Sequence, residues 1–209
     1  MTRRQAAGKR KSDKRKSDKG STSHPGRLRI VAGIWRSRVL EIADVAGLRP
    51  TPERVRETLF NWLTPGITGS RCLDLYAGTG ALGLEALSRG ANEVVFVEKS
   101  RRAVTALQRN FEKLDAHGAS VQQRDAVMFL NDFCGEPFDI VFLDPPFADD
   151  NIAELCRLLA ETNSLKSGAK IYVEQDRHRP EPELPAGWSL LKQKTAGNVR
   201  YALIAVGLE

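Results

Sequence analysis

Residues 73–83 read LDLYAGTGALG, and this stretch decides the fold of the 209-residue chain. The apolar residues before the glycines predict a strand, and the residues after them predict a helix. Gly78, Gly80 and Gly83 fit the pattern Gly-x-Gly-x-x-Gly, in which glycines form a tight turn and let the backbone approach a nucleotide. The stretch therefore predicts a strand–loop–helix unit that binds a nucleotide-containing cofactor.

Strands and helices are expected to alternate from this stretch onwards. Apolar runs predict strands over residues 72–76, 94–97, 120–122, 138–143 and 169–174, and helical spacing predicts helices over residues 81–88, 101–114, 126–133 and 151–160. A final strand pair is expected over residues 188–191 and 199–206. Such repeats predict an α/β fold, with a mixed, mostly parallel sheet and helices on both of its faces.

The chain before this repeat differs in composition. Residues 1–26 hold almost no apolar side chain and carry a net charge of +7, against +6 for the whole chain, so we expect a disordered basic tail. Residues 27–66 are expected to form an extension, namely a β-hairpin with a basic face and a helix that Thr51 caps and that ends near Thr64. Residues 67–209 are then the cofactor-binding catalytic domain.

Composition limits the class of protein. Apolar residues make up 41% of the chain and charged residues 28%, as in soluble globular proteins, and no apolar run is long enough to span a bilayer. The three cysteines and three histidines lack metal-ligand spacing, so no metal site is expected. We therefore expect a cytoplasmic protein that makes no membrane contact. We also expect a monomer, because no separate interface element is evident.

Acids that follow the predicted strands distinguish two kinds of cofactor. Glu98 lies about 20 residues after Gly78, where dinucleotide-binding proteins have their ribose-binding acid. However, Asp74 opposes a pyrophosphate at the glycine turn and favours the ammonium and sulfonium of S-adenosylmethionine. Glu98 could bind the ribose hydroxyls and Asp125 the adenine amino group, although either acid alone could equally cap a helix. The expected cofactor contacts are Asp74, Ala77, Gly78, Thr79, Gly80, Glu98, Lys99, Asp125, Ala126 and Asp144.

A second motif, Asp144-Pro145-Pro146-Phe147, follows the apolar run at residues 138–143. Its prolines make a stiff corner without backbone donors. The exocyclic amine of a nucleobase is a poor nucleophile, because its lone pair is delocalised into the ring. The Asp144 carboxylate and the Pro145 carbonyl could each accept one amine hydrogen and direct the lone pair at a methyl group, while Phe147 stacks on the base. Alone, such a corner is a rigid turn, but beside a cofactor loop it predicts catalysis of amino-methyl transfer.

Basic side chains in the extension indicate a nucleic-acid substrate. They could hold RNA phosphates while one base is extruded into the pocket. The expected RNA contacts are Arg36, Arg38, Arg49, Thr51, Arg54 and Arg56. For Arg54 and Arg56, surface ion pairing with Glu53 and Glu57 remains an alternative. Arg49 has the better case, because it lies in an extended segment near the expected active-site mouth.

Four motifs occur together: RPT at 49–51, RVRETLFN at 54–61, LD at 73–74 with GTGALGLEALSRG at 78–90, and DPPF at 144–147. Their combination resembles the RsmD family of bacterial 16S rRNA guanine-N2 methyltransferases over residues 27–206. The resemblance implies the class I methyltransferase fold, S-adenosylmethionine as donor, S-adenosylhomocysteine as product, and 16S rRNA in the small ribosomal subunit or its assembly intermediate as partner. The chain departs from the family at Pro52, where a second threonine is common, and in its longer basic tail, so neither gains a role from the resemblance.

Three other functions remain open from sequence. A DNA adenine-N6 methyltransferase would share the acid–proline corner, but it usually needs a larger region to read a duplex. A nicotinamide-dependent oxidoreductase would share the glycine pattern, but Asp74 argues against it. A non-catalytic ribosome assembly factor could keep the fold, but it would have no use for the intact corner at residues 144–147.

Overall fold

The computed structural model describes residues 26–43, 45, 48, 50–146, 149 and 151–207. Arg49 and Phe147 of the expected site, and the expected tail as far as residue 25, lie outside the described residues. No helix in the described ranges is long and apolar enough to cross a membrane. In the same ranges, no group of three or more His, Cys, Asp or Glu side chains could hold a metal ion.

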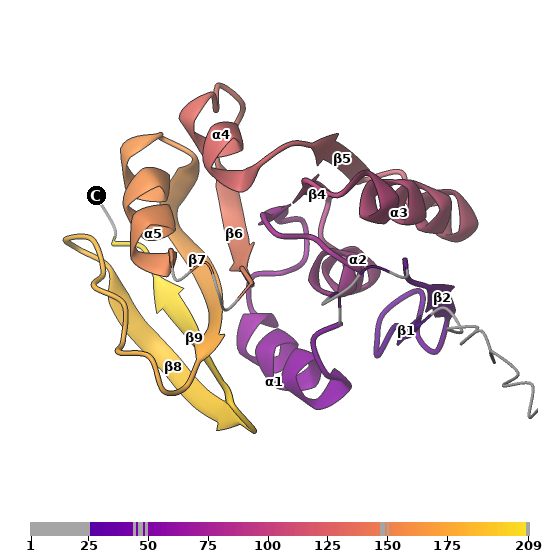
Figure 1. Ribbon diagram of the computed structural model, residues 1–209, viewed down its shortest axis with the longest axis horizontal. Helices are drawn as coiled ribbons and strands as arrows, with labels where there is room; N and C mark the ends of the chain where they lie inside the picture. Colours follow the sequence, from indigo (N-terminus) through magenta and orange to yellow (C-terminus); the bar gives the residue numbers. More distant parts are fainter. Residues whose placement is uncertain are drawn as a thin grey trace, which may run out of the picture.

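A seven-stranded mixed sheet runs through the centre of the protein (Figure 1). Its strands are β3 (Arg71–Asp74), β4 (Glu93–Glu98), β5 (Ala119–Gln123), β6 (Phe138–Leu143), β7 (Leu165–Asp176), β8 (Ser189–Ala196) and β9 (Val199–Ala205). The spatial order is β5-β4-β3-β6-β7-β9-β8, in which β3 to β7 are parallel and the last two strands are antiparallel. The predicted sheet type is confirmed, and the strand order reverses between β3 and β6, where such sheets bind ligands.

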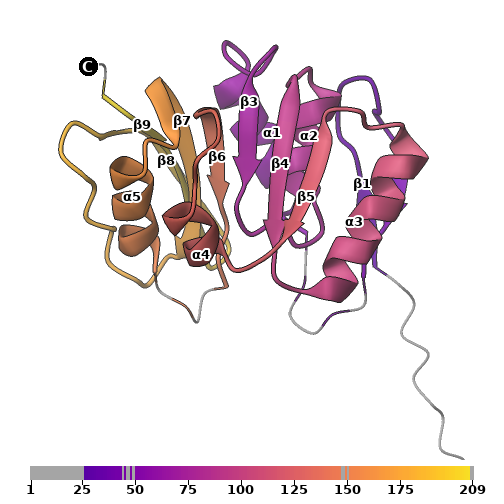
Figure 2. The ribbon, with the colours of Figure 1, turned by 90° about the horizontal axis from the view of Figure 1, so that it is seen from above.

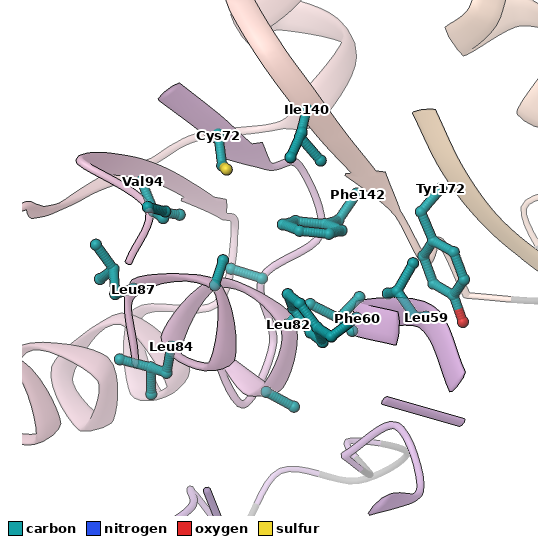
Figure 3. Close-up of a cluster of buried hydrophobic side chains, with 14 of the residues drawn as sticks. Leu59, Phe60, Cys72, Leu82, Leu84, Leu87, Val94, Ile140, Phe142 and Tyr172 are labelled. Carbon is teal, nitrogen blue, oxygen red and sulfur yellow. The ribbon is translucent and has the colours of Figure 1, made fainter. Parts of the chain in front are cut away.

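Helices cover both faces of the sheet, as predicted (Figure 2). One face carries α1 (Glu53–Leu63), α2 (Ala81–Ser88) and α3 (Arg101–Leu114), and the other carries α4 (Ala126–Asn131) and α5 (Ile152–Glu161). Successive side chains of the central strands alternate between the two cores. The core on the face that carries α1, α2 and α3 is called the first core below. Figure 3 shows it, with Phe60 of α1 and Leu82 of α2 against Phe142 of β6. The ring centroids of Phe60 and Phe142 are 6.0 Å apart.

The boundaries of α3 follow directly from its sequence. Ser100 caps the start of the helix by accepting the Ala103 N–H at 3.4 Å, and Asp115 ends it in the left-handed conformation. Leu107 and Leu114 are buried against the sheet. The helix therefore has the bounds that its capping residues and apolar spacing predict.

Three other predicted boundaries were wrong. The helix predicted at 126–133 ends at Asn131, and Phe133 leaves it to pack on Phe138, with ring centroids 5.4 Å apart. The strand predicted at 169–174 begins earlier, at Leu165, because its first residues pair with β6 across a register shift. The strand predicted at 188–191 continues to Ala196, and its solvent-exposed side chains give no apolar signal from which its length could be read.

The N-terminal hairpin is joined to the main body through α2. Strand β1 (Arg27–Arg29) pairs antiparallel with β2 (Val39–Glu41). The backbone N–H groups of Val31 and Ala32 donate to the Glu85 carboxylate at 2.9 and 3.0 Å. Because buried side chains of the hairpin and of α1 belong to the first core, the extension is packed as part of that core.

Candidate active site

A cavity of about 690 Å³ opens at the carboxyl ends of β3, β4, β6 and β7. Its walls come from the segment before α1, the glycine loop, the segments after β4 and β5, and the proline corner. The lining includes Thr51, Asp74, Tyr76, Ala77, Gly78, Thr79, Glu98, Lys99, Ser100, Arg124, Asp125, Ala126, Asp144, Pro145, Pro146 and Glu174. All expected cofactor contacts except Gly80 therefore line one cavity. Asp144, Pro145 and Pro146 of the expected catalytic corner line the same cavity.

The three glycines of the loop have different structural tasks. Gly78 has φ +51° and lines the cavity, where it brings the backbone to the ligand space. Gly80 has φ +77° at the N-cap of α2, and a Cβ there would lie 2.5 Å from Leu107 Cδ2. A Cβ on Gly83 would lie 2.3 Å from a ring carbon of Phe96. Gly80 therefore serves the turn and the close packing against Leu107, and its contact with a cofactor stays a prediction.

Asp74 is an almost completely buried acid at the floor of the cavity. Its side chain is 3% exposed, and its Oδ2 accepts the backbone N–H of Gly83 at 2.9 Å. Burial, together with the charges of Asp144 and Glu98, raises the pKa of Asp74 to about 7, against the opposing effect of the Gly83 hydrogen bond. A bound cation would favour the ionised form of this carboxyl group.

Glu98 and Asp125 both line the cavity and both bind backbone N–H groups. Glu98 accepts from Gly78 at 2.9 Å and from Ser100 at 2.7 Å. Asp125 is the N-cap of α4, where its Oδ1 accepts from Val127 at 2.9 Å and from the next residue at 3.3 Å. The helix-capping alternative for Asp125 is thus observed, and it leaves the acid beside the ligand space.

The proline corner holds Asp144 at the end of β6, next to the segment that precedes α1. The Thr51 hydroxyl contacts Asp144 Oδ2 at 3.4 Å. Thr51 does not cap α1, since Pro52 occupies the N-cap position without a side-chain cap, so the predicted capping role was wrong. Burial raises the pKa of Asp144 to about 6, and the Thr51 hydroxyl opposes this shift.

Glu174 is a cavity residue that the sequence interpretation missed. It lies on β7, is 4% exposed, and accepts the Tyr172 hydroxyl on Oε1 at 2.7 Å. Burial and the Asp144 charge raise the pKa of Glu174 to about 8, against the effect of hydrogen bonds from Tyr172 and Thr51. The sequence does contain a signal for this residue, because Glu174 is an acid at the end of the predicted fifth strand. Acids at the ends of the first three strands were considered as ligands, but the same rule was not applied to the fifth.

Arg56 is not available to RNA, and that prediction was wrong. Its side chain is 2% exposed, and its Nη1 lies 2.9 Å from Oε2 of Glu85 in α2. Its other nitrogens donate to the Thr51 carbonyl at 3.1 Å and to the Arg29 carbonyl at 2.8 Å. The predicted surface pairing with Glu53 or Glu57 is not its role either. Arg56 instead joins the hairpin, α1 and α2 beneath the cavity mouth.

The remaining described arginines of the expected RNA site are exposed: Arg36, Arg38 and Arg54. Arg38 donates to the carbonyl of Lys113 in α3 at 3.0 Å, which places the hairpin against this helix. A groove of about 640 Å³ lies along the same helix and was not foreseen. It is lined by Glu41, Ile42, Ala43, Arg101, Arg102, Thr105, Ala106, Arg109, Asn110 and Lys113.

Comparison with known proteins places the chain among methyltransferases. The family model described as "Conserved hypothetical protein 95" matches residues 28–205. Ribosomal RNA small subunit methyltransferase D of Escherichia coli is 46% identical over 185 residues, covering 88% of this chain and 93% of that protein. The protein of the same name from Haemophilus influenzae is 46% identical over 181 residues, covering 85% and 93%.

Solved structures agree with this assignment. The structure of the Escherichia coli protein yhhF matches with a TM-score of 0.81 and 42% identity, covering 88% of this chain and all of that one. The four motifs from which the resemblance was drawn lie within the residues that the family model matches, and that resemblance is confirmed. The chain belongs to the family described as conserved hypothetical protein 95, the RsmD family, and has the class I S-adenosylmethionine-dependent methyltransferase fold.

Proposed function

We propose that this protein transfers a methyl group from S-adenosylmethionine to the exocyclic N2 amine of a guanine in 16S rRNA. The observation that carries the proposal is the single cavity in which the Asp144 corner lies next to a subsite lined by Asp74, Glu98 and Asp125. The names of the two relatives that are 46% identical support ribosomal RNA of the small subunit as substrate. The substrate is then the small subunit or an assembly intermediate of it.

The acids of the cavity fit this cofactor better than a dinucleotide. Asp74 is buried where it would meet the cationic end of the cofactor, and its raised pKa means that a cation is needed to stabilise its charge. Glu98 and Asp125 lie where ribose hydroxyls and an adenine amine would donate hydrogen bonds. A pyrophosphate in the same place would meet several carboxyl groups, which disfavours a nicotinamide cofactor. The bound cofactor supplies an electrophilic methyl group on sulfur.

Asp144 and Pro145 then act on the amine of the base. The Asp144 carboxylate accepts one amine hydrogen and the Pro145 carbonyl accepts the other, so the nitrogen lone pair points at the methyl carbon. The nitrogen–carbon bond forms as the carbon–sulfur bond breaks, and the nitrogen gives up one proton. Asp144 can take this proton, because burial raises its pKa to about 6, which lies nearer to neutral than for an exposed aspartate.

The surface around the hairpin and α3 is suited to the RNA backbone. Arg36, Arg38 and Arg54 are exposed. The groove along α3 adds Arg101, Arg102, Arg109 and Lys113, and among the described side chains no ion pair joins the arginines of this groove to a carboxylate. Unpaired guanidinium groups bind phosphates without reading sequence. This surface, which we call the α3 groove, would hold the strand while the target base enters the cavity.

The test is methyl transfer from labelled S-adenosylmethionine to small subunits, both assembled and unassembled, that lack the modification, followed by nucleoside analysis. Formation of N2-methylguanosine supports the proposal and identifies the assembly stage that is the substrate. Label on the N6 of adenosine would keep the chemistry and overturn the target. No transfer to any particle, under conditions where the protein binds the cofactor, would favour an assembly factor instead.

A further inference from the structure

Two carboxyl groups lie next to each other at the reacting end of the cavity. Strands β6 and β7 are parallel neighbours, with Leu143 in register with Val173. Asp144 and Glu174 each follow that pair by one residue, so their backbones are separated by about one strand spacing, roughly 5 Å. Because side chains alternate along a strand, both point toward the face on which α1 packs. Amine activation at the corner uses only one of these two acids.

Among the described residues, the surroundings of Glu174 offer it hydrogen-bond donors but no cation. The Tyr172 hydroxyl donates to Oε1 at 2.7 Å, and the Thr51 hydroxyl, 3.4 Å from Asp144, lowers the pKa of both acids. Tyr201 of β9 is its partner across the antiparallel pair. The described groups that face Glu174 are therefore acids, hydroxyls and phenols, so a ligand could still supply an N–H donor to this carboxyl group.

In the part of the chain that the structure describes, the basic residues that line the cavity belong to another part of it. Lys99 directly follows β4, and Arg124 directly follows β5. In the sheet, β3 separates β4 from β6, so both basic residues adjoin the proposed cofactor subsite rather than the corner. A neutral base that carries several N–H donors is the ligand that would relieve the repulsion between Asp144 and Glu174.

Guanine has such an edge, because N1–H stands next to the N2 amine, whereas the N1 of adenine carries no hydrogen. Resting on the proposed function, we propose that Glu174 accepts the N1–H of the target guanine while Asp144 and Pro145 hold its N2 amine. Glu174 is then the residue that selects guanine over bases with an unprotonated N1. The ionised carboxylate of Glu174 accepts this hydrogen more strongly than the protonated acid does, and the N–H donor in turn favours the ionised form.

The substitution Glu174→Gln should change the preferred base. The amide oxygen can still accept the Tyr172 hydroxyl, so the amide NH₂ faces N1 of the base. For guanine, the amide NH₂ of the variant and the N1–H of the base would be two donors facing each other. A base whose N1 is an acceptor could instead accept a hydrogen bond from this NH₂. 2-Aminopurine is such a base, since it keeps the N2 amine and has no hydrogen on N1. Unpaired buried polar groups are the basis of strong discrimination between substrates.

The experiment uses 16S rRNA ligated around the methylated position, once oligonucleotide mapping of the labelled RNA has located it, and assembled into subunits. The target carries either guanosine or 2-aminopurine, and kcat/KM is measured for wild type, Glu174→Gln and the exposed control Glu183→Gln. Wild type and the control should prefer guanosine by at least roughly tenfold. Glu174→Gln should lose roughly 10- to 100-fold on guanosine and use 2-aminopurine as well or better. 2-Aminopurine also lacks the O6 of guanine, but this loss affects all three proteins alike. It therefore cancels when the ratio of kcat/KM for guanosine to that for 2-aminopurine is compared between proteins.

Two results would overturn the assignment. If wild type methylates both bases equally well, Glu174 does not read N1–H, and this result needs no variant to fold. If Glu174→Gln loses activity on both bases by the same factor, the residue has only a structural role. Cofactor affinity, measured by calorimetry, should stay within a few-fold of wild type in each variant. Failure of the proposed function itself is distinguishable, since wild type would then form no N2-methylguanosine at all.

Discussion

Replacing the buried acid at the cavity floor, Asp74→Asn, should stabilise the ligand-free protein. The pKa of Asp74 rises from 3.8 to about 7 in the fold. That shift corresponds to about 4 kcal/mol of unfavourable free energy for the ionised form above pH 7. An asparagine oxygen can still accept the Gly83 N–H, but its new NH₂ is a buried donor, so we expect about half of this value, ~2 kcal/mol. For a chain of this length the melting temperature should rise by roughly 4–8 °C.

The effect of this substitution should depend on pH with a definite sign. Between about pH 4 and pH 7 the folded state holds the Asp74 proton and the unfolded chain has released it. The unfolded state therefore binds fewer protons, and the stability of the wild-type protein falls as the pH rises through this window. Asparagine does not titrate. The variant should therefore be ~2 kcal/mol less stable than wild type at pH 4, where only the cost of its buried NH₂ acts, and ~2 kcal/mol more stable above pH 7.

Urea unfolding at pH 5 and pH 8 measures this difference, and calorimetry with S-adenosylmethionine measures the functional cost. Loss of the charge that meets the cofactor's cationic end should weaken binding by roughly 10- to 100-fold. Asp115→Asn is the matched control, because it removes an exposed charge at a left-handed position that asparagine also tolerates. A less stable Asp74→Asn protein at pH 8, or equal differences at both pH values, would refute the reasoning.

Three further predictions concern the corner, the buried arginine and the RNA surface. Asp144→Asn should lower kcat by at least roughly 100-fold and keep cofactor affinity. The wild-type rate should fall as the pH drops through about 6, where Asp144 gains a proton. An equal loss of cofactor binding in the variant would instead assign Asp144 to the cofactor subsite. Arg56→Met should lower the unfolding free energy by ~3–5 kcal/mol, because Glu85 is left buried without this partner. Its exposed neighbour Arg54 is the control, and Arg54→Ala should lower the unfolding free energy by less than about 0.5 kcal/mol. Equal values would show that the ion pair has no structural role. The double variant Arg101→Glu and Arg102→Glu should weaken RNA binding and flatten its dependence on salt concentration, with unchanged cofactor affinity, whereas an unchanged salt slope would exclude the α3 groove from phosphate contact.

Local sequence was sufficient where structure is decided by neighbours in the chain. The glycine loop, the cap of α3 and the apolar run of β6 each carry their own signal, so the strand–helix alternation and the sheet type were predicted. The three acids at the ends of predicted strands, Asp74, Glu98 and Asp125, were expected to lie close together and do line one cavity. The reason is that the carboxyl ends of parallel strands meet at one edge of the sheet.

Long-range partners explain what the sequence did not reveal. Arg56 looks like a surface residue of an amphipathic helix, and only Glu85, 29 residues later on a different helix, makes its burial possible. The hydroxyl of Thr51 was expected to act locally as a cap, yet it contacts Asp144, 93 residues away. In both cases the deciding contact joins elements whose relative position no local pattern encodes.

The shared electrostatics of the cavity make the effects of its acids non-additive. The charge of Asp144 raises the pKa of Asp74 and also that of Glu174. Removing that charge by Asp144→Asn therefore lowers the penalty at both other sites, so combining it with Asp74→Asn should give less added stability than the sum of the two single variants. Thermal unfolding at pH 8 of the two single variants and the double variant measures this coupling, and strictly additive melting temperatures would contradict it. Because the repulsion is shared, a ligand that brings a cation to Asp74 and N–H donors to Asp144 relieves it in two places, which favours joint binding of cofactor and base.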